Sequence, residues 1–369
     1  MNLFRQLYRY TFSKINSTPF FCHLNITSHC DLKCKHCSVP EDFQRIDKEG
    51  RGDMNFEQIE IAAQNLKKLG VSNILLTGGE PFSRKDLVEI VRLLVRKGFM
   101  VRIATNGASL VTEERMLEVF NAGLYSLQVS FDSMRPELYD EITCKEGTWL
   151  QAKNTLEFAA KHLKKGMSIA LVVVSNLNLD ELPEIARYIT SIGAYCVFQP
   201  VCVWPKLENK YGSVDIQDYN AMNIPESQND KIESIYNELL LMKKEGYNIL
   251  ASERYLRGSL KSLLTRNTQW NCDAYKYYLT VCPNGEILPC HRYEDLDWMN
   301  RINVLDTNFC EEFNSAKMKK QAEGFRNRCP GCVLACYHEM SSFFNDPATF
   351  FDMSFQVARK SLRSLFRRT

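Results

Sequence analysis

Three cysteines stand close together near the start of the chain. They are Cys30, Cys34 and Cys37, on a short segment that follows an apolar run. Three thiolates on one loop can bind three irons of a cubane [4Fe-4S] cluster and leave the fourth iron open to a ligand that is not protein. Chemistry on a bound small molecule could start at that open iron.

A second motif, Gly78-Gly79-Glu80-Pro81, follows the next apolar run. Glycines allow a backbone to approach a ligand closely, and a glutamate supplies an anionic acceptor for an ammonium group. The spacing C-x3-C-x2-C, with this motif behind it, resembles the radical S-adenosylmethionine (SAM) superfamily. The resemblance implies that the cysteines hold a SAM-binding [4Fe-4S] cluster and that Gly78, Gly79 and Glu80 hold the amino group of SAM.

The same resemblance implies further contacts with SAM. Asn106 would lie near SAM, while Ser130 and Asp132 would contact the ribose or its surroundings. His36 stands where relatives often have an aromatic residue that packs on adenine. Local alternatives are a tight turn at Asn106, a backbone-satisfied hydroxyl at Ser130 and an exposed imidazole at His36.

A structural zinc site is the alternative for the first three cysteines. Zinc normally takes four ligands from paired motifs, and no fourth ligand stands close by in the sequence. Cys22 and His23 could complete such a site, but both lie in the apolar run that precedes the loop. The sequence therefore favours the iron-sulfur cluster.

A second group of cysteines lies towards the end of the chain and resembles the SPASM and Twitch extensions of radical SAM enzymes. Its motif positions are Cys272, Gly285, Cys290, Cys329, Cys332 and Cys336. The full SPASM pattern continues with further cysteines, whereas no cysteine follows Cys336 in this sequence. The resemblance therefore implies one auxiliary [4Fe-4S] cluster, held by Cys272 and Cys290 with two of the last three cysteines. A zinc ribbon is the alternative.

The other cysteines carry less information. Three lie in apolar surroundings and are predicted to be buried as small apolar residues; they are Cys22, Cys196 and Cys202. Three are left unassigned, and they are Cys144, Cys282 and Cys310.

Strand and helix patterns alternate along the first 200 residues. Apolar runs of strand length cover 20–26, 73–77, 100–105, 126–131, 168–174 and 195–199. Helical patterns cover 56–69, 86–97, 113–121, 150–164 and 179–191, and Asn55 with Gln58 can cap the first of these helices. Repeated β/α units predict an α/β fold with a parallel sheet and right-handed crossovers. A doubly wound sheet fits this pattern, but the resemblance implies a partial (β/α)6 barrel, and in both folds ligands bind at the carboxyl ends of the strands.

We divide the chain into four units. Residues 1–200 form the radical SAM core, 201–268 a helical linker with helices near 232–245 and 253–264, and 269–345 a small cysteine-rich α+β domain of the SPASM/Twitch type. A hairpin turn is predicted at Pro283 to Gly285. Residues 346–369 are predicted to form a basic amphipathic helix, and a weaker candidate starts at Leu3.

Composition limits the function classes. The net charge of +2 gives no reason to expect a nucleic acid as partner, and no apolar run is long enough to cross a bilayer. The N-terminus is a poor signal peptide. Fourteen cysteines without an export signal indicate metal binding in a reducing cytoplasm. The C-terminal helix could contact a membrane surface peripherally, although a terminal helix more often packs on its own domain.

The resemblance implies an enzyme that cleaves SAM reductively to a 5'-deoxyadenosyl radical, which abstracts hydrogen from a substrate. The auxiliary cluster would assist an oxidative or redox-neutral modification, and a flavodoxin- or ferredoxin-type protein would supply electrons. The substrate would be a peptide or a small molecule such as a tetrapyrrole; the early position of Cys30 leaves no room for a preceding peptide-recognition domain. A non-catalytic electron carrier or sensor is the alternative, but it would not need Glu80.

Overall fold

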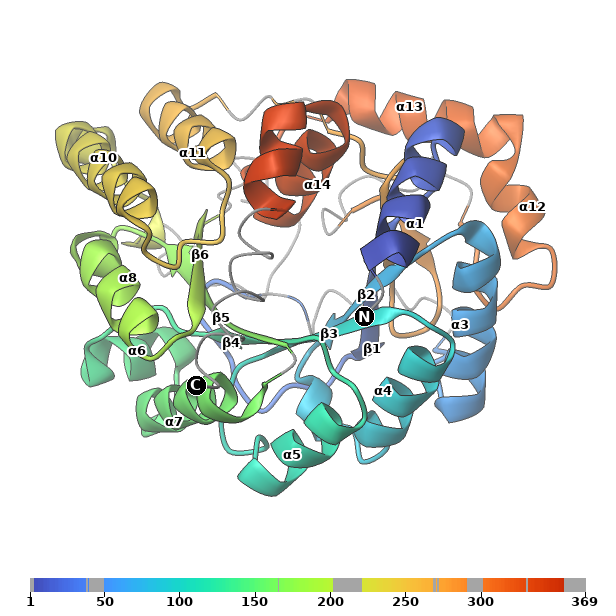
Figure 1. Cartoon of the computed structure of the whole chain (residues 1–369), viewed down its shortest axis with the longest axis horizontal. Coiled ribbons are helices and arrows are strands. Elements are labelled where there is room, and N and C mark those ends of the chain that lie inside the picture. The colour runs from blue at the N-terminus through green and yellow to red at the C-terminus, as the bar shows by residue number, and fades with distance from the viewer. Residues whose placement is uncertain are drawn as a thin grey trace.

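The computed structural model describes residues 3–37, 39, 50–164, 166–201, 221–267, 270, 272–290, 301–329 and 331–354. One eight-stranded sheet runs through it in the order β6-β5-β4-β3-β2-β1-β7-β8. The sheet curves around the centre of the molecule, and α3 to α8 lie on its outer side (Figure 1). The class is α/β, as predicted.

The first six strands are parallel neighbours in chain order. They are β1 (Phe21–Thr27), β2 (Asn73–Gly78), β3 (Met100–Thr105), β4 (Ser126–Ser130), β5 (Met167–Val174) and β6 (Tyr195–Pro200). A doubly wound sheet would reverse its strand order at a switch point. The uninterrupted order is that of the partial (β/α)6 barrel, which confirms the predicted fold.

Helices connect these strands where the sequence predicts them. They are α3 (Phe56–Leu69), α4 (Leu87–Arg96), α5 (Glu113–Asn121), α7 (Thr148–His162) and α8 (Leu182–Ser191). The capping box predicted for α3 is present, since Asn55 accepts from the Gln58 N–H and Gln58 accepts from the Asn55 N–H, each at 2.9 Å. A short helix that the sequence did not predict, α6 (Pro136–Thr143), lies between β4 and α7. Single-turn 3-10 helices occur at Pro81–Ser83, Leu179–Glu181 and Glu226–Gln228.

The main core lies between the sheet and these helices. Along β1, Leu24 and Ile26 are fully buried, and they belong to the same apolar cluster as Ile59 and Leu66 of α3. Residues that alternate with them in a strand point to the opposite side, towards the barrel interior. The sheet thus keeps its apolar side for the helices and leaves the interior and the strand ends available for a site.

The remaining described elements follow β6. They are α10 (Asn229–Glu245), α11 (Glu253–Thr265), β7 (Tyr278–Val281), β8 (Ile287–Leu288), α12 (Phe309–Asn314), α13 (Ala316–Arg328) and α14 (Ala335–Asn345). The predicted turn joins β7 to β8, and the N–H of Gly285 donates to the Cys282 carbonyl at 2.9 Å with a φ of 86° at the glycine. β7 pairs in parallel with β1, with Phe21 opposite Tyr278. The C-terminal cysteine region is therefore attached to the same sheet as the barrel.

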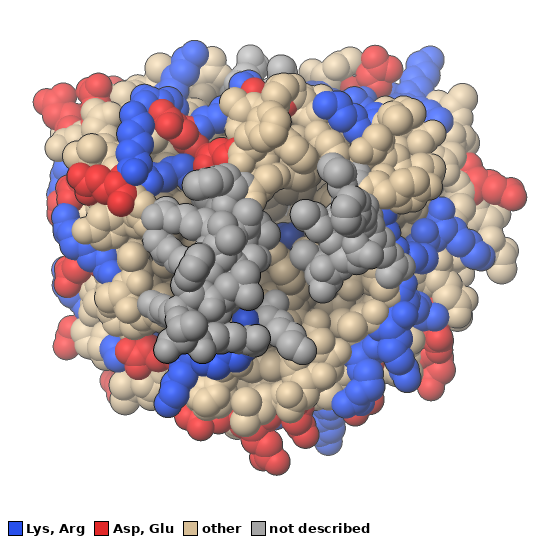
Figure 2. Space-filling model, in the orientation of Figure 1, with Lys and Arg blue, Asp and Glu red and all other residues tan. Residues whose placement is uncertain are grey.

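Helix α1 (Leu3–Asn16) precedes the sheet. No helix in the described part of the chain is both long and apolar enough to cross a membrane. The basic helix predicted near the C-terminus falls largely on residues 355–369, which lie outside the described residues. The division into four units stays a prediction. Acidic and basic side chains both occur around the edge of the face in Figure 2.

Candidate functional site

The first three cysteines lie on the loop that leaves β1. Asp53 holds the start of this loop, because its carboxylate accepts from the Thr27 hydroxyl at 2.7 Å and from the Ser28 N–H at 3.0 Å. A turn closes the other end, where the Cys37 N–H donates to the Cys34 carbonyl at 3.0 Å. All three cysteines are half-buried. The loop is thus fixed at both ends with its thiols together at the carboxyl end of β1.

These thiols are in an environment that disfavours free thiolates. Burial raises the pKa of Cys30 and, more strongly, that of Cys34, where the nearby Cys37 thiol adds to the shift. A backbone N–H of Leu32 directed at Cys30 opposes it. Bound iron would lower these raised pKa values, because metal coordination stabilises the deprotonated thiol. The donor set therefore fits an iron-sulfur cluster.

The glycines of the second motif lie against the cysteine loop. A Cβ on Gly78 would stand 2.2 Å from the Thr27 carbonyl oxygen, and one on Gly79 would stand 2.1 Å from that of His29. The N–H groups of Gly79 and Glu80 donate to these two oxygens at 2.8 and 2.7 Å. The close approach that requires glycine here is to protein backbone, so the motif also joins β2 to the cysteine loop.

Glu80 is buried between the ends of β2 and β3. Its Oε1 accepts from the Thr105 hydroxyl at 2.8 Å and the Phe82 N–H at 2.9 Å, and its Oε2 accepts from the Asn106 N–H at 2.8 Å. Burial raises its pKa to about 7 despite these bonds. Oε2 keeps one acceptor position. An ammonium group placed there would lower the pKa again and keep the carboxylate ionised.

Asn106 connects Glu80 to the cysteine loop. Its Nδ2 donates to Asp31 Oδ1 at 2.8 Å and lies 3.9 Å from Cys30 Sγ, while its Oδ1 accepts from the Ala108 N–H at 2.8 Å. The last bond is the turn interaction that was the local alternative, and contact of Asn106 with SAM stays a prediction. Asp31, which also accepts from Ser109 Oγ at 3.2 Å, was missed from the sequence.

His36 and Asp132 lie near each other. Asp132 Oδ1 accepts from the Val173 N–H at 2.7 Å; burial raises the pKa of this carboxyl, and the charge of His36 opposes the shift. His36 Nδ1 is buried and finds no hydrogen-bond partner among the described residues. Ser130 is half-buried, and its carbonyl accepts from the Tyr139 hydroxyl at 2.9 Å. Contacts of all three residues with SAM stay predictions.

The second cysteine group gathers around Tyr278. Cys272, Cys290 and Cys336 belong to the small apolar cluster that contains this tyrosine, and so does Cys282. Burial raises the pKa of Cys272 to about 11, and the nearby Cys329 thiol adds to the shift. The structure therefore brings together cysteines that are far apart in the sequence.

Backbone N–H groups point at the sulfurs of this group as they do at Cys30. Gly331 donates to Cys329 Sγ at 3.4 Å, and Ala274 donates to the sulfur of Cys272. Each donor stands two residues after its cysteine. Cys332 differs, because its Sγ lies 3.5 Å from Nε2 of His338.

The other cysteines have varied surroundings. Cys22 and Cys196 are fully buried in the main core, as predicted, whereas Cys202 lies outside the described residues. Cys144 is exposed at the end of α6, and Cys310 Sγ lies 3.5 Å from the Asn65 carbonyl oxygen. Within the described ranges, no three His, Cys, Asp or Glu side chains form a group that could hold a single metal ion.

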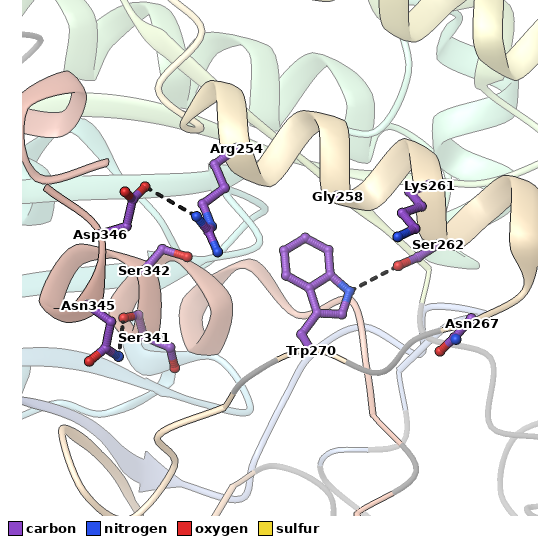
Figure 3. A pocket seen from close by; sticks show the side chains of 10 residues that line it. All are labelled: Arg254, Gly258, Lys261, Ser262, Asn267, Trp270, Ser341, Ser342, Asn345 and Asp346. Atoms are coloured by element: carbon purple, nitrogen blue, oxygen red, sulfur yellow. Dashed lines mark hydrogen bonds and ion pairs between the residues drawn. The ribbon is translucent and has the colours of Figure 1, made fainter. Parts of the chain in front are cut away.

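A cavity of about 540 Å³ lies between α11 and α14 (Figure 3), and no residue of the first cysteine loop lines it. Trp270 forms part of its wall and donates through Nε1 to Ser262 Oγ at 2.9 Å. The indole also packs on the ring of His338, with ring centroids 4.0 Å apart, and His338 Nε2 lies 2.8 Å from the Cys332 carbonyl oxygen. The cavity wall thus supports the second cysteine group.

Replacing Gly258 with alanine should destabilise this wall. The new Cβ would lie 2.0 Å from Cη2 of Trp270, so the indole must move. Overpacking costs about 1–3 kcal/mol, which exceeds the helix propensity that alanine gains over glycine. We expect a lower midpoint of thermal unfolding for Gly258→Ala, measured against Lys261→Ala at an exposed position of the same helix. An unchanged midpoint would show that the indole moves without cost.

Comparison with known proteins agrees with this site. The family model described as "Radical SAM superfamily" matches residues 24–189, which include the cysteine loop, Glu80, Asn106 and Asp132. Residues 24–189 form a radical SAM domain. The matched region runs from Leu24 within β1 to most of α8 and leaves out β6, the last strand of the barrel.

Curated relatives with this domain have two different named activities. GTP 3',8-cyclase of Vibrio vulnificus (strain YJ016) is 27% identical over 170 residues, which cover 46% of this chain and 50% of that protein. PqqA peptide cyclase of Bradyrhizobium diazoefficiens is 26% identical over 292 residues, covering 78% of this chain and 70% of that protein. This radical SAM chain thus spans about half the length of the GTP 3',8-cyclase.

Solved structures share the fold over most of the chain. Streptococcus suis SuiB bound to its precursor peptide SuiA has a TM-score of 0.62 at 15% identity and covers 89% of this chain and 73% of its own. The structure titled "Native anSMEcpe with bound AdoMet" has a TM-score of 0.57 at 18% identity and covers 93% and 99%. These likenesses extend beyond the barrel into the C-terminal region.

Proposed function

We propose that this radical SAM protein is an enzyme that binds SAM at the cluster of Cys30, Cys34 and Cys37. When bound there, the [4Fe-4S] cluster supplies the electron that cleaves SAM to methionine and a 5'-deoxyadenosyl radical. Glu80 would hold the amino group of SAM, since its buried carboxylate is oriented by three hydrogen bonds and keeps an acceptor position. This placement of Glu80 beside the cysteine loop is the observation that carries the proposal.

The neighbouring residues would position SAM and exclude water. Asn106 fixes the cysteine loop relative to Glu80 through its bond to Asp31. His36 would pack on the adenine, while Ser130 and Asp132 would contact the ribose or its surroundings. A closed polar site of this kind protects a reactive radical from side reactions.

We infer that the second cysteine group holds one auxiliary [4Fe-4S] cluster. Cys272 and Cys290 supply two ligands, and the proximity of Cys329 to Cys272 favours Cys329 as the third. Cys332 or Cys336 would be the fourth. The cluster would accept the electron left on a product radical, or would bind substrate, and would favour an oxidative or redox-neutral outcome.

A peptide is the first candidate for the substrate. Two relatives support it, the PqqA peptide cyclase and the SuiB structure with its bound precursor peptide. The GTP 3',8-cyclases keep a small-molecule substrate as the second candidate. A flavodoxin- or ferredoxin-type protein would supply the electrons, in the cytoplasm.

The direct test is SAM turnover by the iron-loaded protein. Anaerobically reconstituted enzyme with SAM and dithionite should form 5'-deoxyadenosine without any added substrate, measured by chromatography. A fully loaded protein that forms none with dithionite or with a reduced flavodoxin would overturn the enzyme proposal. It would leave the non-catalytic electron carrier or sensor as the better account.

Changing Glu80 to alanine should weaken SAM binding. The variant removes an ionised acceptor, and a hydrogen bond to a charged group contributes about 1.5–3 kcal/mol. We expect the dissociation constant of SAM, measured by calorimetry on iron-loaded protein, to rise accordingly. Glu57→Ala, at an exposed position of α3, is the matched control and should bind SAM as the wild type does. Equal affinity in both variants would remove Glu80 from the site.

A further inference from the structure

Helix α1 presents an apolar stripe to solvent. Tyr8, Phe12 and Ile15 are 70%, 43% and 75% exposed, and their spacing places them on one side of the helix. Ser13 and Tyr10 lie on the other side, where Ser13 is fully buried. The helix therefore packs on the protein through one face and leaves an apolar face uncovered among the described residues.

The packed face of α1 meets the last described part of the chain. The Tyr10 ring lies 5.0 Å from Phe344 of α14 and 4.8 Å from Phe350, measured between ring centroids. α1 and α14 accordingly lie side by side in Figure 1. Phe351 follows Phe350 and is 68% exposed. The exposed apolar residues thus come from both ends of the chain.

Basic residues accompany this apolar surface. Residues 3–16 contain Arg5, Arg9 and Lys14 and no acidic residue. A hollow of about 170 Å³ beside the stripe is lined by residues that include Tyr8, Arg9 and Phe12. Lys14, next to Ile15, is exposed. The sequence after the last described residue, Ser354, adds five basic residues and no acidic one, and they are Arg359, Lys360, Arg363, Arg367 and Arg368. Basic residues without acidic ones therefore occur in α1 itself, and the sequence after Ser354 is basic as well.

We propose that this surface, defined by Tyr8, Phe12 and Ile15, docks on an anionic phospholipid membrane. An apolar stripe that enters the headgroup region, together with basic residues that attract acidic lipids, supplies the two signals that stable peripheral binding needs. A second copy of the chain fits less well, because a two-fold interface would bring the same basic residues face to face. Aromatic rings at two of the three positions suit the membrane interface.

The test is co-sedimentation of the full, iron-loaded chain with vesicles under anaerobic conditions. Vesicles of phosphatidylglycerol and phosphatidylcholine in equal parts should bind the protein, and vesicles of phosphatidylcholine alone should not. Added salt should weaken the binding, since it screens the basic residues. No binding to the acidic vesicles would overturn the proposal.

Two variants locate the docking surface. Ile15→Glu should lower vesicle binding by on the order of tenfold, because it places a charge where the proposal puts an apolar side chain into the headgroup region. Leu241→Glu on α10, a position that is 56% exposed, is the matched control and should bind as the wild type does. Equal loss in both variants would overturn the assignment to α1. A concentration-dependent dimer that Ile15→Glu abolishes would show that a second copy covers the stripe instead. None of these outcomes depends on SAM cleavage, so they are separate from the test of the enzyme proposal.

Discussion

Replacing Cys30, Cys34 and Cys37 together with alanine is expected to abolish the formation of 5'-deoxyadenosine. These three residues supply all the protein ligands proposed for the SAM-binding cluster, and without it no electron reaches SAM. The measurement is 5'-deoxyadenosine after anaerobic incubation with SAM and dithionite. We expect no product above the protein-free control. Turnover in this variant would show that SAM is cleaved elsewhere.

The same variant separates the two proposed clusters. Wild-type protein should contain about eight irons, four for each cubane, and the variant about four. Zinc in the second cysteine group would give about four irons and one zinc in the wild type and none of the iron in the variant. Metal analysis with Mössbauer spectra distinguishes these outcomes. Close to twelve irons in the wild type would mean that the single auxiliary cluster is an undercount. Cys22→Ala, in the main core, is the control and should keep all eight.

Replacing Gly79 with alanine should disrupt the backbone contact that holds β2 against the cysteine loop. The added Cβ would lie 2.1 Å from the His29 carbonyl oxygen and 2.4 Å from its carbon, and both are backbone atoms that cannot rotate away. The end of β2 and the cysteine loop would have to separate. We expect a loss of about 3 kcal/mol or more in the free energy of unfolding, at the upper end of overpacking costs, together with loss of SAM binding.

Gly52→Ala is the control for this change. A Cβ there meets nothing within 4 Å, but the φ of 69° makes alanine cost about 1–2 kcal/mol. Gly79 has no such positive φ, so a larger loss at Gly79 than at Gly52 in chemical denaturation would come from the contact with His29. Equal destabilisation of both variants would contradict a close approach at Gly79.

Most of the barrel could be predicted because each of its strands is a local apolar run bounded by polar residues and glycines. The run at Met100–Thr105 and the helix at Glu113–Asn121 have the predicted bounds. Helix α6 was missed because its eight residues are too few to show a helical period. β7 is only four residues long, and its pairing with β1 depends on contacts that no local pattern reveals.

The site residues also fall into two groups, those with a local signal in the sequence and those that depend on distant contacts. Cysteine spacing and the Gly78-Gly79-Glu80 motif are local, so they could be found. Asp31 and Asp53 are single acidic residues in polar segments, and only the folded chain shows that Asp31 binds Asn106 and that Asp53 holds the start of the loop. The sequence indicates a turn at Asn106, but only the folded chain shows that the same side chain also binds Asp31. Residues that support a site through tertiary contacts have no signature of their own in sequence.

The pairing of β1 with β7 has a consequence for synthesis of the protein on the ribosome. Asn25 in β1 donates through Nδ2 to the Val281 carbonyl at 2.7 Å, across a separation of 256 positions. One edge of β1 therefore stays without its partner until Tyr278–Val281 has been made, and closing so long a loop is slow. β1 leads into the first cysteine loop, and the β7–β8 hairpin lies next to Cys282 and Cys290. Each of them needs the other to complete its pairing in the sheet. We expect the nascent protein to become competent for loading both clusters at one late step, rather than one cluster at a time.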